Sequence, residues 1–252
     1  MINGRKIRLI SLFVCLVFFS SCRPEEYQVE TYFAEDNLEE KIQFVSHEDI
    51  FIEKIKDQIF DPSSKYIIVN KEYSLNEDYI PEDLVALEVP TIFEDPEINQ
   101  LREEVADMLK KMFKAAETED ITLYSRSGYR SYRTQVHLFN RYASNQDEED
   151  ANLHGARPGE SEHQTGLAVD ITSESVGYKL VEEFSSTREY NWVKENAHEY
   201  GFIIRYPKDK EEITGYMYEP WHLRYLGEEL ATYIFKSGLS YEEYLEKGGC
   251  DV

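Results

Sequence analysis

The sequence has 252 residues, with 27 lysines and arginines against 50 aspartates and glutamates, and its formal net charge is −23 at pH 7. This acidity argues against nucleic-acid binding, which needs a basic surface, and against electrostatic adhesion to anionic lipids or wall polymers. The charge is most simply a means of keeping the protein soluble.

The first 21 residues have the pattern of an export signal. Three basic residues precede an apolar run, Leu9–Phe19, and two serines separate this run from Cys22. A basic stretch, an apolar core of about 7–15 residues and small residues at the cleavage point are typical of secretory signals. Serines directly before a cysteine resemble the lipobox of bacterial lipoproteins, although Phe19 stands where that motif usually has leucine. We expect residues 1–21 to be removed and Cys22 to be acylated, so that this lipid alone holds the exported protein at the membrane; simple secretion is the alternative.

Residues 22–60 are predicted to be an extension that precedes the main domain. Residues 23–40 are acidic and aperiodic, which suits a tether. Within residues 47–60, apolar side chains recur at near-helical spacing and predict a short helix. Residues 61–252 then have the length of one ordinary domain.

The first half of this domain is predicted to contain a strand and a long helix. Tyr66–Val69 has the pattern of a strand, and residues 74–90 that of an extended segment around the core. Asp95 followed by Pro96 is a strong signal for the start of a helix. Apolar residues continue at a spacing of three to four as far as Phe113, and we expect this stripe to face the core.

The second half mixes short strands with helices. We predict strands at Ile121–Tyr124, Gly166–Thr172, Phe202–Tyr206 and Glu219–Tyr225, a turn at Ser125–Gly128, helices at 131–144 and Thr187–Tyr200, and a last helix opened by a capping box at Ser240–Glu243. This irregular order favours an α+β fold, in which helices flank a small antiparallel sheet, over a repeating βαβ sheet.

Two imidazoles and a carboxylate are candidates to share one zinc ion. Six residues that include Gly166 separate His163 from Asp170, so a loop followed by a strand can bring the two together. Asp170 ends an apolar stretch, where an acid needs a partner such as a metal ion. With His222 as the third ligand, a fourth position stays open for water, as in catalytic zinc sites.

Glu219 precedes His222 by three residues, and Pro220 between them makes the backbone irregular enough to turn both side chains into one cleft. Glu219 would there accept a proton from water. By spacing alone, histidines that pack or are solvated remain the alternative to a zinc site. We assign that role to the other four, His47, His137, His154 and His198, and none of the three cysteines has a setting that suits a zinc ligand.

Three ordered motifs carry the most specific information: Ser127-Gly-Tyr-Arg-Ser131 with Gln135, Ala156-Arg-Pro-Gly-Glu-Ser-Glu-His-Gln-Thr-Gly-Leu-Ala-Val-Asp170, and Glu219-Pro-Trp-His-Leu-Arg-Tyr225. They resemble the D-alanyl-D-alanine carboxypeptidase family that is related to vancomycin resistance. The resemblance covers about residues 64–247. It implies that residues 61–252 form a zinc carboxypeptidase domain, with the zinc site in a groove.

The resemblance implies one zinc ion per chain, bound by His163, Asp170 and His222. It makes Glu219 the catalytic general base and Arg130 the residue that faces the scissile carbonyl. Glu219 would accept the proton of the attacking water and later pass it to the departing amine. Arg130 would help to stabilise the oxyanion.

The same resemblance places Gln135 and Ser161 along the substrate groove. Without it, Arg130 would be interpreted as a surface ion-pair residue. Gln135 would then be a polar residue on a helix surface, and Ser161 a residue that makes hydrogen bonds within a loop.

The implied substrates are peptidoglycan stem peptides, and the preferred reaction removes the terminal D-alanine from a stem that ends in D-Ala-D-Ala. The nearest alternative is an L,D-carboxypeptidase that trims tetrapeptide stems to tripeptides with the same residues; a cell-wall endopeptidase is less favoured. A non-catalytic wall-binding zinc module is the alternative from another class, and the intact Glu219 argues against it. A monomer is the default state.

Overall fold

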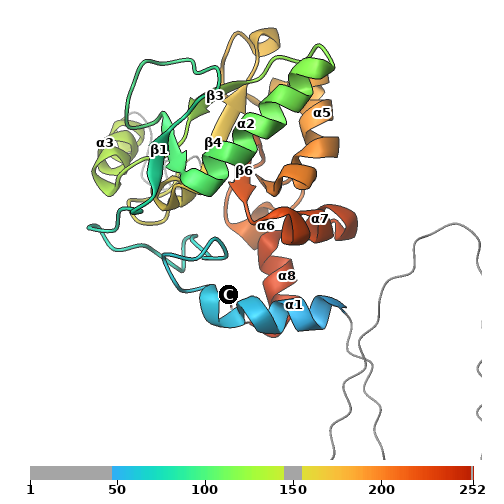
Figure 1. The fold of residues 1–252 in the computed structure, drawn as a ribbon. Helices are drawn as coiled ribbons and strands as arrows, with labels where there is room; N and C mark the ends of the chain where they lie inside the picture. Colours follow the sequence, from blue (N-terminus) through green and yellow to red (C-terminus); the bar gives the residue numbers. More distant parts are fainter. Residues whose placement is uncertain (1–46, 145–154, 251) are drawn as a thin grey trace, which may run out of the picture. The chain divides into compact units, whose positions relative to one another are not determined.

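The computed structural model describes residues 47–144, 155–250 and 252, and it contains a four-stranded antiparallel sheet (Figure 1). The strand order is β3-β4-β6-β5, with bounds Tyr124–Ser127 for β3, Ala168–Thr172 for β4, Glu219–Tyr225 for β6 and Phe202–Tyr206 for β5. A separate two-stranded antiparallel sheet pairs β1, Leu84–Ala86, with β2, Gln100–Arg102. The expected α+β class with small antiparallel sheets is confirmed.

Helices flank these sheets. The α-helices are α1 (His47–Ile55), α2 (Glu103–Thr118), α3 (Tyr132–Ala143), α5 (Arg188–Asn196), α6 (Glu211–Thr214), α7 (Glu228–Ser237) and α8 (Tyr241–Lys247). Short 3-10 helices are η1 (Lys56–Gln58), η2 (Glu162–Thr165), η3 (Glu174–Val176), η4 (Glu182–Ser186) and η5 (Ala197–Tyr200).

The apolar face of α2 packs on the four-stranded sheet. Val105, Leu109 and Met112 of α2 share one buried cluster with Val169 of β4 and Leu223 of β6. In Figure 1, α2 (green) crosses in front of β4. Because burial of each large apolar side chain contributes about 1.5–3 kcal/mol, this layer holds in place the two strands that carry most of the candidate site.

A second buried cluster joins the first and last helices of the described chain. Ile55 of α1, Leu230 of α7 and Leu245 of α8 belong to it. The start of α8 is fixed by the predicted capping box, since the Ser240 side chain accepts a hydrogen bond from the Glu243 amide and the Glu243 side chain accepts one from the Ser240 amide. The box therefore marks the residue at which α8 begins and satisfies two amide donors at that end.

Several predicted elements are confirmed with their bounds. Strands β5 and β6 begin and end where the sequence predicted them. The predicted helix at Thr187–Tyr200 is α5 followed by η5, with Thr187 as its N-cap and Gly201 as its end. The predicted helix at 131–144 is α3, Tyr132–Ala143, which is one residue shorter at each end.

The predicted strand at Tyr66–Val69 is wrong, because these residues pair with no neighbouring strand. Their side chains are apolar and Ile67–Val69 are buried, which is why the run resembles a strand. The carbonyl of Ile67, however, accepts a hydrogen bond from the buried guanidinium of Arg224 at 2.6 Å. A side chain thus satisfies a backbone group that a neighbouring strand would otherwise bind.

The predicted start of the long helix is also wrong, since α2 begins at Glu103. The Asp95 side chain accepts a hydrogen bond from the amide of Glu97, so Asp95 and Pro96 start a single turn. The chain then leaves the helical path because Gln100–Arg102 pairs with Leu84–Ala86 as β2.

Strand β3 lies three residues beyond its predicted place. Ser125 and Ser127, which were expected to form a turn, pair instead with Ile171 and Asp170 of β4. The register shifts between these two serines. Because the residues at this irregularity are polar, the sequence lacks the alternation of apolar and polar residues that predicts a strand.

No helix among the described residues has the length and hydropathy needed to cross a membrane. The predicted signal at 1–21, Cys22, the tether up to residue 46 and His154 all lie outside the described residues.

Candidate active site

The structure brings His163, Asp170 and His222 together. His163 lies in η2, Asp170 on β4 and His222 on β6, and the register of the sheet sets Asp170 directly opposite His222. One potential ligand atom from each of the three lies within 4.8 Å of those of the other two. All three side chains are buried, with at most 3% of each residue exposed.

The chain returns from His163 to the sheet through Gly166. This glycine has a φ of 66°, in the left-handed region, and its amide donates a hydrogen bond to the carbonyl of His163 at 3.2 Å. Strand β4 follows immediately and carries Asp170 back to the imidazole. The expected loop-then-strand path between these two residues is confirmed.

Each imidazole has one nitrogen held by a group outside the metal cluster, and its other nitrogen faces Asp170. Nδ1 of His163 lies 2.7 Å from the carbonyl of Gly128, to which its N–H donates. Nε2 of His163 is buried without a hydrogen-bond partner and lies 3.3 Å from Oδ2 of Asp170. On His222, Nδ1 lies 3.1 Å from Oδ1 of Asp170, while Nε2 is engaged elsewhere, 3.2 Å from Oε2 of Glu162.

The cluster has the ligand types and the close spacing that a zinc ion needs. Ligand atoms at about 2.0–2.2 Å from zinc lie about 3.4 Å from one another. Nδ1 of His222 lies 3.1 Å from Oδ1 of Asp170 and Nε2 of His163 lies 3.3 Å from the other oxygen, Oδ2, so each imidazole faces one carboxylate oxygen at close to that distance. Two neutral imidazoles and a carboxylate are also a ligand set that zinc commonly takes, with one position left for water or substrate.

The backbone around Gly128 leaves no room for another residue. A Cβ atom there would lie 2.4 Å from the carbonyl oxygen of Gln100 and 2.9 Å from that of Ile98. The carbonyl that orients His163 therefore depends on a glycine that packs directly against neighbouring backbone.

The three groups of the cluster differ in the proton that each holds near pH 7. Burial lowers the pKa of His163 to about 4, so this imidazole is neutral near pH 7. Against the effect of burial, hydrogen bonds to Asp170 and Glu162 raise the pKa of His222 to about 9. Although burial opposes it, His163, His222 and Arg130 hold the pKa of Asp170 well below its usual range. A metal ion must therefore displace a proton from His222 but none from His163 or Asp170.

Glu219 lies at the edge of this cluster. Its Oε2 is 3.7 Å from Nδ1 of His222, although the two residues are three apart on one strand. The pairing of β5 with β6 explains this, because Ile204 faces Leu223 whereas Tyr206 faces Glu219, which leaves surplus residues on β6. The irregular backbone expected at Pro220 is confirmed.

The environment of Glu219 suits acid–base chemistry. Burial is the main cause that raises its pKa to about 7, and the nearby Asp170 carboxylate adds to the effect. A carboxylate whose pKa is close to neutral can both accept and release a proton during turnover.

Arg130 and Gln135 reach the same cluster. The Arg130 guanidinium donates hydrogen bonds to Oε1 of Gln135 at 3.1 Å and to Oδ2 of Asp170 at 3.3 Å. The Gln135 amide in turn donates to the carbonyl of Ala156 at 2.8 Å. Ser161 is buried immediately before η2, and its carbonyl accepts a hydrogen bond from the amide of Gln164. The Arg130 side chain is 14% exposed, and it forms an ion pair with Asp170, whose side chain is 5% exposed.

The structure also shows why two of the other histidines do not join the cluster. His137 is exposed on α3, and His198 stacks on Phe235 with ring centroids 4.0 Å apart. Both are therefore solvated or packing residues, as expected.

Sequence reasoning missed Glu162. This carboxylate is fully buried next to His163 and contacts His222, Arg205 and Arg224. Although burial alone would raise it, the two arginines hold the pKa of Glu162 below its usual range. The available signal was an arginine inside each of two apolar strands, since a buried guanidinium requires a carboxylate partner.

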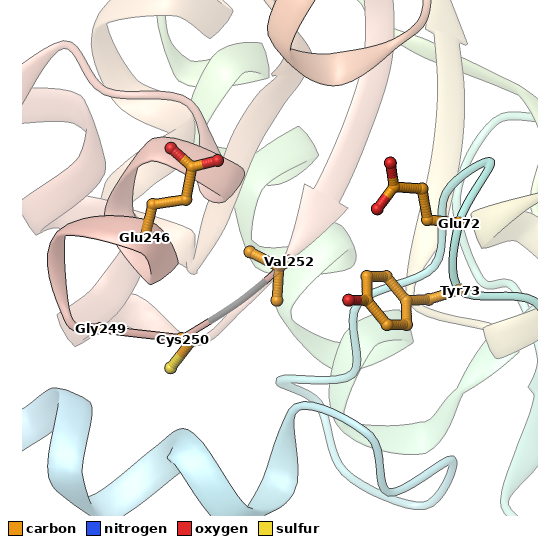
Figure 2. Close-up of a pocket in the computed structure, with 6 residues that line it drawn as sticks. All are labelled: Glu72, Tyr73, Glu246, Gly249, Cys250 and Val252. Carbon is orange, nitrogen blue, oxygen red and sulfur yellow. The ribbon is translucent and has the colours of Figure 1, made fainter.

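A separate hollow of about 380 Å³ lies at the C-terminal end of the chain and is lined by Glu72, Tyr73, Glu246, Gly249, Cys250 and Val252 (Figure 2). It shares no residue with the metal cluster or with the groups around it. We assign it no part in the chemistry.

Comparison with known proteins gives one consistent result. A model of the VanY family, described as D-alanyl-D-alanine carboxypeptidase, matches residues 98–228. The chain is 50% identical over 190 residues to YodJ of Bacillus subtilis (strain 168), provisionally named a carboxypeptidase, and the match covers 75% of this chain and 70% of that protein.

Two solved structures share the fold at substantial identity. The LdcB LD-carboxypeptidase is 50% identical with a TM-score of 0.71, and the match covers 74% of this chain and 88% of LdcB. A mutant of the vancomycin-resistance D,D-pentapeptidase VanY in complex with Zn(II) is 34% identical with a TM-score of 0.57, covering 71% of this chain and 97% of that one.

Proposed function

The chain belongs to the VanY family of D-alanyl-D-alanine carboxypeptidases, and we propose that it removes the C-terminal D-alanine from peptidoglycan stem peptides that end in D-Ala-D-Ala. It is a zinc metallocarboxypeptidase. The observation that supports the reaction most directly is the buried group of His163, Asp170 and His222 with Glu219 at its edge. A binding module has no need of such a base.

His163, Asp170 and His222 are the residues that would hold the zinc ion. When bound, zinc polarises the scissile carbonyl and makes a water molecule a stronger acid. Glu219 accepts the proton of the attacking water on its carboxylate and passes it to the departing amine of D-alanine. Burial raises the pKa of Glu219, which favours the protonated carboxyl group that the second transfer needs.

Arg130 is the proposed stabiliser of negative charge on the carbonyl oxygen. Its guanidinium is fixed by Gln135 and Asp170, so little reorganisation is needed when the charge develops. Gln135 and Ser161 are the residues that we propose to line the bound peptide. Gln135 would have a second role, since it also holds Arg130 in place.

An L,D-carboxypeptidase, which trims tetrapeptide stems to tripeptides, is the second candidate. The similarity to LdcB supports it, since the identity of 50% exceeds the 34% to the D,D-pentapeptidase VanY. Both reactions release D-alanine and use the same zinc ligands and base. They differ in the residue that precedes the scissile bond, which is D-alanine in the pentapeptide and a residue of L configuration in the tetrapeptide.

Mass spectrometry of products from defined stem peptides separates the candidates. We expect the zinc-loaded protein to remove one alanine from a pentapeptide stem and to leave a tetrapeptide stem intact. Cleavage of the tetrapeptide with the pentapeptide spared would move the assignment to the L,D reaction. If neither peptide is cleaved although zinc is bound, the proposed carboxypeptidase activity is wrong, and a non-catalytic wall-binding module becomes the better assignment.

We further propose that the protein acts outside the cytoplasm as a lipoprotein anchored through Cys22, with residues 22–60 as an acidic tether and a short helix and residues 61–252 as its catalytic domain. The signal-like sequence before Cys22 supports this location. In cells fed a labelled fatty acid, the protein should become labelled, and Cys22→Ser should abolish the label. Export of an unlabelled parent protein would instead support simple secretion.

A further inference from the structure

Glu162 links the candidate metal site to a buried network of charges. Its two carboxylate oxygens have different partners. Oε2 lies 3.2 Å from Nε2 of His222, and Oε1 accepts hydrogen bonds from Arg205 at 2.7 Å and from Arg224 at 2.6 Å. The side chains of Glu162 and both arginines have no exposed surface.

We propose that Glu162 is a positioning residue, which accepts the Nε2–H of His222 and so directs Nδ1 of this imidazole to the metal ion. This inference rests on the proposed function and adds a residue to its machinery. An imidazole that binds a metal through one nitrogen commonly donates its other N–H to a carboxylate or carbonyl. The carbonyl of Gly128 does this for His163, and Glu162 does it for His222. The two histidines therefore present opposite nitrogens, Nε2 of His163 and Nδ1 of His222.

The arginines keep the Glu162 carboxylate from turning. Arg205 is held by two hydrogen bonds to Glu242, at 2.8 and 2.5 Å. Arg224 donates to the carbonyls of Lys65 and Ile67 at 3.0 and 2.6 Å. Because both guanidinium groups are fixed on Oε1, the orientation of Oε2 toward His222 is fixed as well.

Glu162→Gln tests the role because an amide cannot accept hydrogen bonds from the two arginines and also accept one from His222. The arginines carry only donors, so they require the amide oxygen. The NH₂ group must then face Nε2 of His222, which favours the imidazole with its proton on Nδ1, the atom that should bind zinc. We expect the zinc affinity to fall by about 10–100-fold, as is typical when a partner of a ligating histidine is lost.

Glu242→Gln is the matched control. Glu242 is also buried and also binds Arg205, but it has no contact with His222 among the described hydrogen bonds and ion pairs. Both variants should be less stable, whereas only Glu162→Gln should lose zinc affinity; we expect Glu242→Gln to stay within about threefold of the parent. An equal loss of zinc affinity in both variants would overturn the proposal, because Glu162 would then only stabilise the fold.

A measurement on the parent protein decides the matter even if Glu162→Gln does not fold. In the zinc-loaded protein with ¹⁵N-labelled histidine, NMR should show His222 protonated on Nε2 and His163 protonated on Nδ1. A spectrum with His222 protonated on Nδ1 would refute the positioning role. Neither this readout nor the zinc affinity depends on peptide cleavage, so failure of the proposed function would be seen separately in the product assay.

Discussion

Replacing Glu219 with alanine should leave zinc bound and lower the turnover of the preferred stem peptide by about 10²–10⁴-fold. Acid–base help from a positioned side chain is typically worth this factor. Glu219 is not among the three residues of the metal cluster, yet its carboxylate lies 3.7 Å from one of them. The substitution therefore removes the proton acceptor and keeps the metal ligands.

The measurement combines turnover of the stem peptide with the zinc content of the purified variant. Glu212→Ala is the matched control, since Glu212 is an exposed glutamate on α6 a few residues before Glu219. It should retain parental turnover. Near-normal activity in Glu219→Ala would remove Glu219 from its role. Loss of zinc together with activity would show that the Glu219 carboxylate is needed to bind the metal ion, and would not support its role as proton acceptor.

The parts of the fold that follow from local pattern were predictable. Strand β5 was predicted with its bounds because its largely apolar run lies between Gly201 and Pro207, and β6 was predicted with its bounds as well. The N-cap at Thr187 and the capping box at Ser240 are likewise local. Each of these features depends on residues close together in sequence.

The errors arise where distant residues override local preference. Asp95 and Pro96 favour a helix, but the pairing of Gln100–Arg102 with Leu84–Ala86 delays α2 to Glu103. Tyr66–Val69 favours a strand, but Arg224 binds the carbonyl of Ile67. No local pattern contains either long-range contact.

Some features of the candidate site could likewise be predicted from local motifs, and others depend on distant residues. The motifs identify which residue types could bind zinc, and the fold does bring His163, Asp170 and His222 together. The sequence could not show which nitrogen of each imidazole is free, because that depends on Gly128 and Glu162. Nor could it show that Glu219 has a pKa near neutral, which results from burial and from Asp170 on another strand.

Replacing His163 with alanine should abolish stoichiometric zinc binding, and with it the turnover of the stem peptide. The variant removes a neutral imidazole whose Nε2 is buried and has no hydrogen-bond partner, so its lone pair is available only to a bound ion. Two ligands from the chain then remain where catalytic zinc sites commonly have three. We expect the affinity to fall by more than about 100-fold, the upper end of the loss seen for outer partners of a ligand.

Zinc content after dialysis, together with an affinity from titration, checks this result, and circular dichroism of the metal-free proteins checks the fold. His137→Ala is the control, because His137 is exposed on α3 and lies outside the metal cluster. It should bind one zinc ion per chain and keep its activity. A full complement of zinc in His163→Ala would refute its assignment as a ligand. If both variants fold but only His163→Ala lacks zinc, the loss follows from the missing nitrogen, since each variant removes one imidazole of the same size.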